Sequence, residues 1–318
     1  MSDLKNLLGY SEPIFNASMA GAAGGAMAAA VSAAGGVGMI GVAPTPTADW
    51  ISAQAAHVAE LDSPWGVGFM GWALEADLSP LESFLQYNPS LIVISFGDVT
   101  RAAALAHEAG VMTAMQIGNA ADLDRAMHND IDIIIARGGE GGGHGRNESG
   151  TLPLLQLACT QHQKPVVAAG GIGTAGGVAA VLAAGAEAAW IGTRFLATKE
   201  ASGHENLKAA VRASGLDDTV YTRAFDIAQQ LDWAPEYGGR ALRNSFSNRY
   251  AEAIDSLQAT EKLREQMIRA RAEADISMAP VYAGEAAEFV RREESCAEVL
   301  AELSGFRRIL QEAAARFA

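Results

Sequence analysis

Short runs of apolar and β-branched residues alternate along this chain with alanine-rich segments whose apolar positions recur at helical spacing. Short apolar runs bounded by turn residues are typical of strands buried on both faces. Their alternation with amphipathic segments is typical of repeated βα units around a parallel sheet. The pattern predicts eight strands, at residues 13–17, 37–41, 65–70, 91–95, 112–116, 132–136, 165–169 and 188–192.

The spacing of these strands indicates the architecture. Successive strands begin about 20 to 33 residues apart, which is room for one strand, one helix and two loops. Eight such units favour a (β/α)8 TIM barrel over an open doubly wound sheet. We therefore expect residues 1–201 to form the barrel and helices within residues 281–318 to complete it.

Residues 202–280 break this pattern, because they are charged, helical in period and without a convincing strand. The clearest helix surface in them is the charged run at residues 261–273. We expect this segment to form a smaller helical subdomain beside the barrel mouth, where it would act as a lid over a substrate.

Composition narrows the classes of function. The chain has 318 residues, of which 49% are hydrophobic and 19% charged, so it can bury a large core. A formal net charge of −14 argues against binding to nucleic acid or to an anionic membrane surface. No apolar stretch reaches the roughly 20 residues needed to cross a bilayer. Two widely separated cysteines, Cys159 and Cys296, favour a protein of the reducing cytoplasm.

A glycine-rich segment with one histidine, His144, follows the sixth predicted strand. Glycine loses the most backbone entropy on ordering, so residues 136–146 are predicted to form a loop rather than a strand interior. Such a loop lets the backbone of Gly142 and Gly143 and one imidazole approach a ligand. The alternative is a flexible surface linker.

Two further glycine pairs stand where barrels often bind phosphate, after strands seven and eight. Gly170 and Gly171 follow the seventh strand, and Gly192 and Thr193 follow the eighth. Their backbone N–H groups, a hydroxyl and a helix N-terminus suit a phosphate dianion. The alternative is that these glycines only allow helices to pack closely on strands. No Gly-x-x-x-x-Gly-Lys-Ser/Thr motif is present, which favours a phosphorylated cofactor over a nucleoside triphosphate.

Together these segments resemble the nitronate monooxygenase family, formerly called 2-nitropropane dioxygenases. The Gly-Gly-Glu-Gly-Gly-Gly-His run ending at His144 is similar to the family's Gly-x-Glu-Ala-Gly-Gly-His motif. The other similar segments are Pro-Ile-Phe-Asn-Ala-Ser-Met at 13–19, Ala-Gly-Gly-Ile-Gly at 169–173, Ile-Gly-Thr-Arg-Phe-Leu at 191–196, Gly-Arg-Ala-Leu-Arg-Asn at 239–244 and Tyr-Ala-Gly-Glu-Ala-Ala at 282–287. The resemblance covers nearly the whole chain.

The resemblance implies an FMN enzyme, with each residue's role carried over by similarity. The phosphate would be held by the residues after strands seven and eight, and His144 would stand on the substrate side. The residues implied to contact the flavin are Ala17, Ser18 and Met19 along its ring, Gln116 at its polar edge, Gly142 and Gly143 in the histidine loop, and Gly170, Gly171, Gly192 and Thr193 at its phosphate.

The chain departs from the family pattern at three places. Ala17 and Ser18 stand where relatives often have two glycines, and Gly68 stands where the third strand often carries asparagine. Gln116 replaces a lysine found in some relatives, which removes a cationic partner for the flavin's pyrimidine edge.

The implied reaction is oxidation of an alkyl nitronate with O2 to a carbonyl compound and nitrite. His144 would donate a hydrogen bond to the nitro oxygens, or act as a base if a neutral nitroalkane is the substrate. The main alternative on the same scaffold is an FMN-dependent NAD(P)H reductase of enoyl thioesters or quinones. A non-catalytic flavin-binding protein is a third. The sequence leaves open the roles of Glu140, Arg137 and Arg146, and whether the chain acts alone or as a homodimer.

Overall fold

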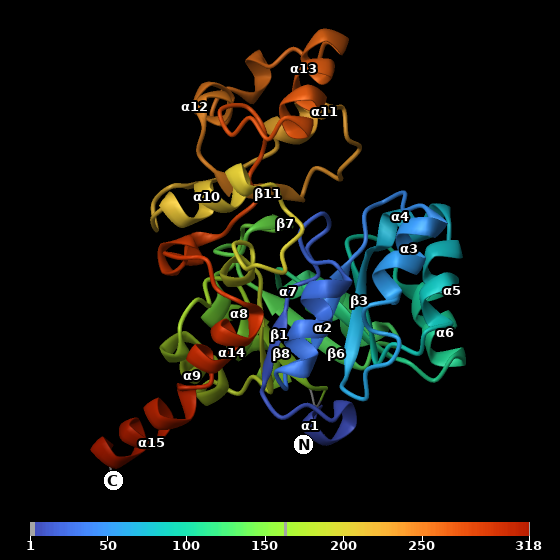
Figure 1. The fold of residues 1–318 in the computed structure, drawn as a ribbon, viewed down its shortest axis with the longest axis vertical. Coiled ribbons are helices and arrows are strands. Elements are labelled where there is room, and N and C mark those ends of the chain that lie inside the picture. Colours follow the sequence, from blue (N-terminus) through green and yellow to red (C-terminus); the bar gives the residue numbers. More distant parts are fainter. Residues whose placement is uncertain (1–3, 162–163, 318) are drawn as a thin grey trace.

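The computed structural model describes residues 4–161 and 164–317 and confirms the predicted TIM barrel (Figure 1). Each of the eight predicted strands is present, and each begins and ends within one residue of its predicted position. The barrel strands are β1 (Ile14–Asn16), β2 (Gly38–Gly41), β3 (Trp65–Met70), β4 (Leu91–Ser95), β5 (Met112–Ile117), β6 (Ile133–Arg137), β8 (Val166–Ala169) and β9 (Ala188–Ile191).

All eight strands are parallel, in the order β1-β9-β8-β6-β5-β4-β3-β2. A single parallel bridge between Phe15 and Val37 joins the two end strands, where the backbone N–H of Val37 donates to the carbonyl of Ile14 at 3.2 Å. The sheet therefore closes on itself, and the carboxyl ends of all eight strands meet at one mouth.

Helices follow the strands as the alternating pattern predicts. The barrel helices are α2 (Gly25–Ala33), α3 (Ala48–Ala55), α4 (Gly71–Ala76), α5 (Ser79–Leu85), α6 (Thr100–Glu108), α7 (Ala120–His128), α8 (Thr151–Gln161) and α9 (Ala175–Ala183), and the 3-10 turn η1 (Thr193–Phe195) follows β9. The strands are apolar throughout because each is covered twice. In β4, for example, Val93 packs inside the barrel and Ile92 packs against the helices.

A short N-terminal helix, α1 (Leu4–Leu8), closes the bottom of the barrel at the end away from the mouth (Figure 1). Leu4, Leu8 and Tyr10 belong to the same apolar cluster as Phe15 inside the barrel. The backbone N–H of Leu4 donates to the Glu187 carboxylate at 2.7 Å. This plug leaves the mouth as the accessible end of the barrel interior.

The last part of the chain packs against the barrel wall. It comprises η3 (Glu285–Phe289), α14 (Cys296–Leu303) and α15 (Phe306–Phe317). Cys296, Val299 and Leu300 of α14 join the core that lies between strands and helices. A buried ion pair holds this helix in place, since Arg194 donates to Glu294 at 2.9 Å and to Glu302 at 2.7 Å.

The ion pair at Glu294 makes stability depend on pH. Burial raises the pKa of this carboxyl group, but hydrogen bonds from Arg194 and Arg292 outweigh burial and hold its pKa below the ordinary value. The ion pair therefore stabilises the fold fully at pH values above the pKa that Glu294 has in the unfolded chain. This stabilisation is lost as pH falls through the lower pKa that Glu294 has in the folded protein. We expect Glu294→Gln to lower the free energy of unfolding by about 3 kcal/mol at pH 7.

Urea titrations of both proteins at several pH values test this expectation. The difference between wild type and Glu294→Gln should shrink on acidification, because a protonated glutamic acid resembles glutamine. A difference that is constant from pH 7 to pH 3 would contradict the assignment.

Residues 202–280 contain strands as well as helices, so the expectation of no strand there is wrong. The segment comprises α10 (Glu205–Ala213), β10 (Thr219–Thr222), α11 (Ala224–Gln229), β11 (Gly238–Leu242), α12 (Ser245–Tyr250), the 3-10 turn η2 (Ile254–Ser256) and α13 (Glu261–Ala272). Helices α11, α12 and α13 lie at the end of the molecule opposite α1 (Figure 1). Within the described residues, no helix is both long enough and apolar enough to cross a membrane.

The two strands pair with the glycine-rich segment. β11 is the centre of a three-stranded antiparallel sheet, with β10 on one side and β7 (Gly143–Gly145) on the other. Part of the predicted glycine loop is therefore a strand, contrary to expectation. These strands are three to five residues long and two of them contain paired or spaced glycines, so they lack the apolar runs by which the barrel strands were predicted.

Candidate active site

A cavity of about 490 Å³ lies at the mouth of the barrel. Its wall includes residues from the ends of the strands and from residues 202–280. Every residue predicted to bind a cofactor or substrate lines it: Ala17, Ser18, Met19, Gln116, Gly142, Gly143, His144, Gly170, Gly171, Gly192 and Thr193. The structure thus brings the candidate residues to one cavity, although they come from five separate stretches of the sequence.

The glycines after β8 and β9 form one corner of this cavity. Gly170 and Gly171 have positive φ angles of 104° and 67°, which non-glycine residues rarely adopt. Within the described residues, the backbone N–H groups of Gly170, Gly171 and Gly192 donate to no acceptor. The hydroxyl of Thr193 accepts from the backbone N–H of Gly284 at 3.0 Å, which leaves its own proton for another acceptor. Such a set of free donors suits an anion.

The backbone conformation at Gly170 is the part of this corner least able to tolerate a side chain. A Cβ there would lie 2.8 Å from the Thr151 hydroxyl and 3.0 Å from the Gly138 carbonyl oxygen. We expect Gly170→Ala to lower the free energy of unfolding by about 1–3 kcal/mol, through strain at positive φ and this crowding. It should also weaken the binding of an anion at this corner.

Gly176→Ala is the matched control, because Gly176 lies in α9 and a Cβ there meets only the Thr174 hydroxyl at 3.6 Å. Alanine should be neutral or stabilise this helix by about 0.5–1 kcal/mol. Thermal unfolding of both variants and their affinity for inorganic phosphate are the measurements. Equal behaviour of the two variants would contradict the role given to Gly170.

Two of the departures from the family pattern compensate each other. Ser18 follows β1 and approaches Gly68 of β3, where a Cβ would lie 2.1 Å from the Ser18 hydroxyl. The side chain of Ser18 therefore occupies space that a side chain at position 68 would need.

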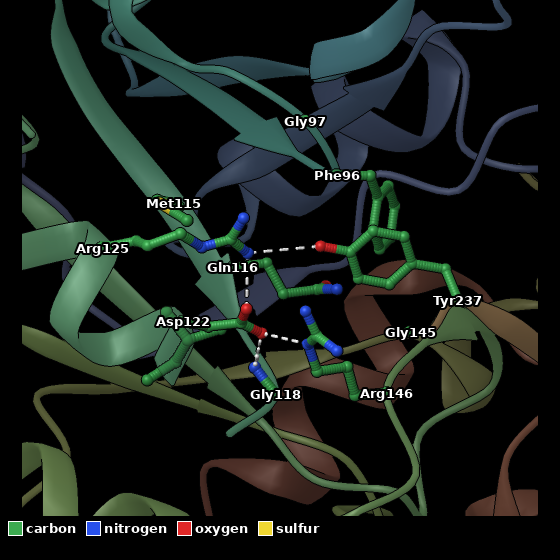
Figure 2. A pocket seen from close by; sticks show the side chains of 11 residues that line it. Phe96, Gly97, Met115, Gln116, Gly118, Asp122, Arg125, Gly145, Arg146 and Tyr237 are labelled. Carbon is green, nitrogen blue, oxygen red and sulfur yellow. Dashed lines mark hydrogen bonds and ion pairs between the residues drawn. The ribbon is translucent and has the colours of Figure 1, made fainter. Parts of the chain in front are cut away.

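Gln116 lies near the end of β5, close to Asp122, Arg125 and Arg146, with which it also lines a second, small pocket (Figure 2).

Arg137 holds the glycine-rich segment in shape. Its buried guanidinium donates to the carbonyl oxygens of Gly141, Gly142 and Gly143 and, at 3.0 Å, to that of Arg146. Burial, followed by the charge of Arg240, lowers the pKa of Arg137 to about 10, so it stays charged at neutral pH. The segment is consequently a fixed part of the wall rather than a flexible linker.

Glu140 has a structural partner outside its own turn. Its carboxylate accepts from the backbone N–H of Thr151 at 3.0 Å and from the Thr151 hydroxyl at 2.9 Å, at the start of α8. That hydroxyl also lies 2.9 Å from the carbonyl oxygen of Gly170. Glu140 therefore links the histidine segment to the glycine corner.

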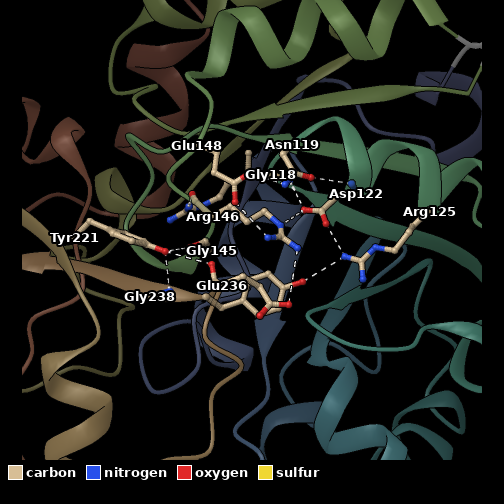
Figure 3. A network of polar contacts seen from close by, with 12 residues as sticks. Gly118, Asn119, Asp122, Arg125, Gly145, Arg146, Glu148, Tyr221, Glu236 and Gly238 are labelled. Atoms are coloured by element: carbon tan, nitrogen blue, oxygen red, sulfur yellow. Dashed lines mark hydrogen bonds and ion pairs between the residues drawn. The ribbon is translucent and has the colours of Figure 1, made fainter. Parts of the chain in front are cut away.

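Arg146 anchors the other end of β7 to the barrel (Figure 3). Its Nε donates to the Asp122 carboxylate at 2.8 Å, and its guanidinium lies 5.0 Å from the centre of the Tyr237 ring. The Tyr221 hydroxyl donates to the Gly145 carbonyl at 2.9 Å and accepts from the backbone N–H of Gly238. The strand that carries His144 is thus fixed at both ends.

His144 is held by residues of the 202–280 segment. Its Nε2 lies 2.9 Å from Oδ1 of Asp226, whose side chain is 2% exposed. Its ring stacks on Trp233 with centroids 3.8 Å apart and planes 4° from parallel. The hydroxyl of Tyr282 lies 3.5 Å from the same Asp226 oxygen. Burial raises the pKa of Tyr282, and the charge of Asp226 raises it further, so this hydroxyl stays protonated at neutral pH.

Sequence reasoning missed Asp226, because 82 residues separate it from His144. The one local signal is an aspartate between the apolar residues Phe225 and Ile227 of α11, on a helix whose other residues are mostly buried. A buried carboxylate requires a hydrogen-bond or ion-pair partner, so an aspartate at an apolar helix position is a candidate functional residue. Its partner is identifiable only from the fold.

Comparison with known proteins decides the family. The sequence profile described as nitronate monooxygenase matches residues 1–305. The chain belongs to the nitronate monooxygenase family. A curated nitronate monooxygenase of Paraburkholderia phytofirmans is 28% identical to it over 349 residues, covering 93% of this chain and 92% of that protein.

Another curated relative carries a different activity. The (3aS,4S,5R,7aS)-5-hydroxy-7a-methyl-1-oxo-octahydro-1H-indene-4-carboxyl-CoA dehydrogenase of Rhodococcus jostii is 34% identical over 225 residues, which cover 70% of this chain. The match spans 63% of the length of that dehydrogenase, and the same share of its counterpart from Mycobacterium tuberculosis.

Two solved structures share the whole fold of this family member. FabK from Thermotoga maritima superposes with a TM-score of 0.83 at 27% identity, covering 98% of both chains. The nitroalkane oxidase of Streptomyces ansochromogenes superposes with a TM-score of 0.82 at 26% identity, covering 100% of both chains. The nitronate monooxygenase family and its FabK-like neighbours are flavin enzymes, and the cavity's volume and free backbone donors fit a flavin with its phosphate.

Proposed function

We propose that this protein is an FMN-dependent oxidoreductase that converts alkyl nitronates and O2 to a carbonyl compound and nitrite. The observation that carries this proposal is the pairing of His144 with buried Asp226 in the wall of a cavity that also offers free anion donors at its glycine corner. Membership of the nitronate monooxygenase family supports it. Bound FMN would supply an acceptor for the electrons of the nitronate.

The residues of the cavity divide this work between them. Gly170, Gly171, Gly192 and Thr193 would hold the phosphate with their N–H groups and hydroxyl. Ala17, Ser18 and Met19 would lie along the ring, Gln116 would face its polar edge with an amide that both donates and accepts, and Gly142 and Gly143 would leave room beside it. These assignments follow the family resemblance, and they are supported by the finding that all of these residues line the one cavity.

His144 would act on the substrate through Nδ1. Asp226 accepts from Nε2, so it favours the tautomer that leaves Nδ1 without a proton. In that form Nδ1 can take the α-proton of a neutral nitroalkane. Once protonated, it donates to a nitro oxygen of a nitronate, with the positive charge of the ring balanced by Asp226.

The charge of the wall suits an anionic substrate. Within the described residues, no Asp or Glu lines the cavity, whereas Arg137, Lys208 and Arg271 do. This distribution is notable in a chain of net charge −14, because it places positive potential where the nitronate would bind.

Turnover of propionate 3-nitronate by the purified, FMN-loaded protein tests the proposal. We expect consumption of O2 and formation of nitrite, both dependent on the protein and on bound flavin. Heat-denatured protein with the same amount of FMN is the control. Absence of nitrite at saturating nitronate would contradict the proposed reaction.

A second candidate is oxidation or reduction of an acyl thioester with a nicotinamide cofactor. The relative from Rhodococcus jostii, a carboxyl-CoA dehydrogenase at 34% identity, is the observation that favours it. It predicts that NADH or NADPH reduces the flavin and that an enoyl thioester or quinone reoxidises it. A bound flavin that neither nitronate nor nicotinamide reduces would indicate a non-catalytic binding protein.

We also propose a cytoplasmic setting for the reaction, on the basis of the cysteine usage.

A further inference from the structure

Lys208 is a buried cation in the wall of the same cavity, and beyond its share in the positive potential of that wall the proposed reaction gives it no contact with a ligand. It lies on α10 and is 7% exposed, and its Nζ donates to the carbonyl oxygen of Thr198 at 2.8 Å. Among the described residues, no carboxylate forms an ion pair with it. Glu205, one turn earlier, is exposed and pairs with Arg212. A buried ammonium group requires acceptors or an opposite charge, and one carbonyl satisfies only one of its three donors.

The other cations of the cavity differ from Lys208 in exposure or in partners. Arg137 donates to four backbone carbonyls of the glycine-rich segment, so its guanidinium is committed to holding that segment in shape. Arg271 is exposed and donates to the side chain of Gln229. Lys208 is a buried positive charge of this wall with one hydrogen bond among the described residues, to a single carbonyl oxygen, which leaves two of its donors for a ligand.

The position of Lys208 indicates which anion it would meet. Its partner Thr198 follows the turn η1 three residues after that turn ends, and η1 begins with Thr193 of the glycine corner. α10 packs on the same stretch, since Val211 and Leu207 contact the cluster that contains Leu196 and Ala197. The ammonium group is thus bonded to the segment that continues from Gly192 and Thr193, and it lines the same cavity as these two residues.

We propose that Lys208 binds a phosphate group inside this cavity. The phosphate could come from the flavin itself, or from a second substrate such as a phosphorylated nicotinamide or a CoA thioester. The inference deepens the proposed function. The alternative in which the phosphate belongs to the flavin rests on that function. Loss of the Lys208 charge should weaken binding of the phosphate ligand about tenfold or more, as expected for a charge-assisted hydrogen bond.

Binding measurements on Lys208→Met and Lys208→Arg test this proposal independently of turnover. Fluorescence quenching gives the affinity of the flavin-free protein for FMN and riboflavin. Calorimetry on the flavin-loaded protein then compares NADPH with NADH and CoA with pantetheine. Lys199→Met is the matched control, because it removes the same charge at an exposed position next to Thr198.

A selective loss in Lys208→Met supports the proposal and identifies the source of the phosphate. Weaker FMN with unchanged riboflavin assigns Lys208 to the flavin, whereas weaker NADPH or CoA with unchanged NADH or pantetheine assigns it to a second substrate. Lys208→Arg and Lys199→Met should bind as wild type does. Equal affinity of Lys208→Met and wild type for every phosphate ligand would overturn the proposal. An equal loss of affinity for the matched compounds riboflavin, NADH and pantetheine would overturn it as well. Failure of nitronate turnover alone would count against the proposed function and not against this inference.

Discussion

Replacement of His144 by alanine is expected to lower nitronate turnover by about 10²- to 10⁴-fold, the range for loss of a positioned acid or base. The flavin should remain bound, because none of the free donors in the glycine corner belongs to His144. Initial rates of nitrite formation and the visible spectrum of the purified variant measure the two effects.

The matched control for this variant is His128→Ala, since His128 is 76% exposed at the end of α7 and lies outside the cavity wall. Its rate should equal that of wild type. An unchanged rate in His144→Ala would remove His144 from the mechanism. A colourless His144→Ala protein would mean that the residue supports flavin binding instead.

Asp226→Asn is expected to lower kcat by about 10- to 100-fold with a small change in KM. The amide keeps the shape of the side chain but loses the charge that balances a protonated His144, and its NH2 group can favour the wrong tautomer. Asp226 is 2% exposed and does not line the cavity, so it acts through His144 rather than on the substrate. Steady-state kinetics over a range of pH measure the effect.

The double variant distinguishes positioning of His144 from a general structural effect. If Asp226 acts only through His144, then Asp226→Asn should cost nothing further in the His144→Ala background. Asp255→Asn, an exposed aspartate in the same segment, is the control for charge removal. Losses that add in the double variant would show that Asp226 has a role independent of the histidine.

The barrel was predictable from the sequence because its strands carry a strong local signal. Each is an apolar run buried on both faces, and each is followed by a helix, so periodicity alone located all eight within one residue. The glycines at 170 and 171 were informative for the same reason, because their positive φ angles are a local requirement of the backbone.

The missed features depend on contacts between distant segments. Strand β7 exists only because β11, about 95 residues later in the chain, supplies its hydrogen-bond partners. The stack of His144 on Trp233 and its bond to Asp226 likewise join the barrel to residues 202–280. Nothing in the local pattern around Gly143 or Asp226 specifies such a partner, so the sequence identified the histidine but not the groups that hold it.

The reaction of the bound flavin with nitronate in the absence of O2 tests the central claim most directly. The visible band of the purified protein is followed after addition of propionate 3-nitronate and, separately, of NADH or NADPH. The proposed function predicts rapid bleaching by the nitronate and little response to either nicotinamide. Bleaching by a nicotinamide alone would contradict it and favour the thioester or quinone reductase.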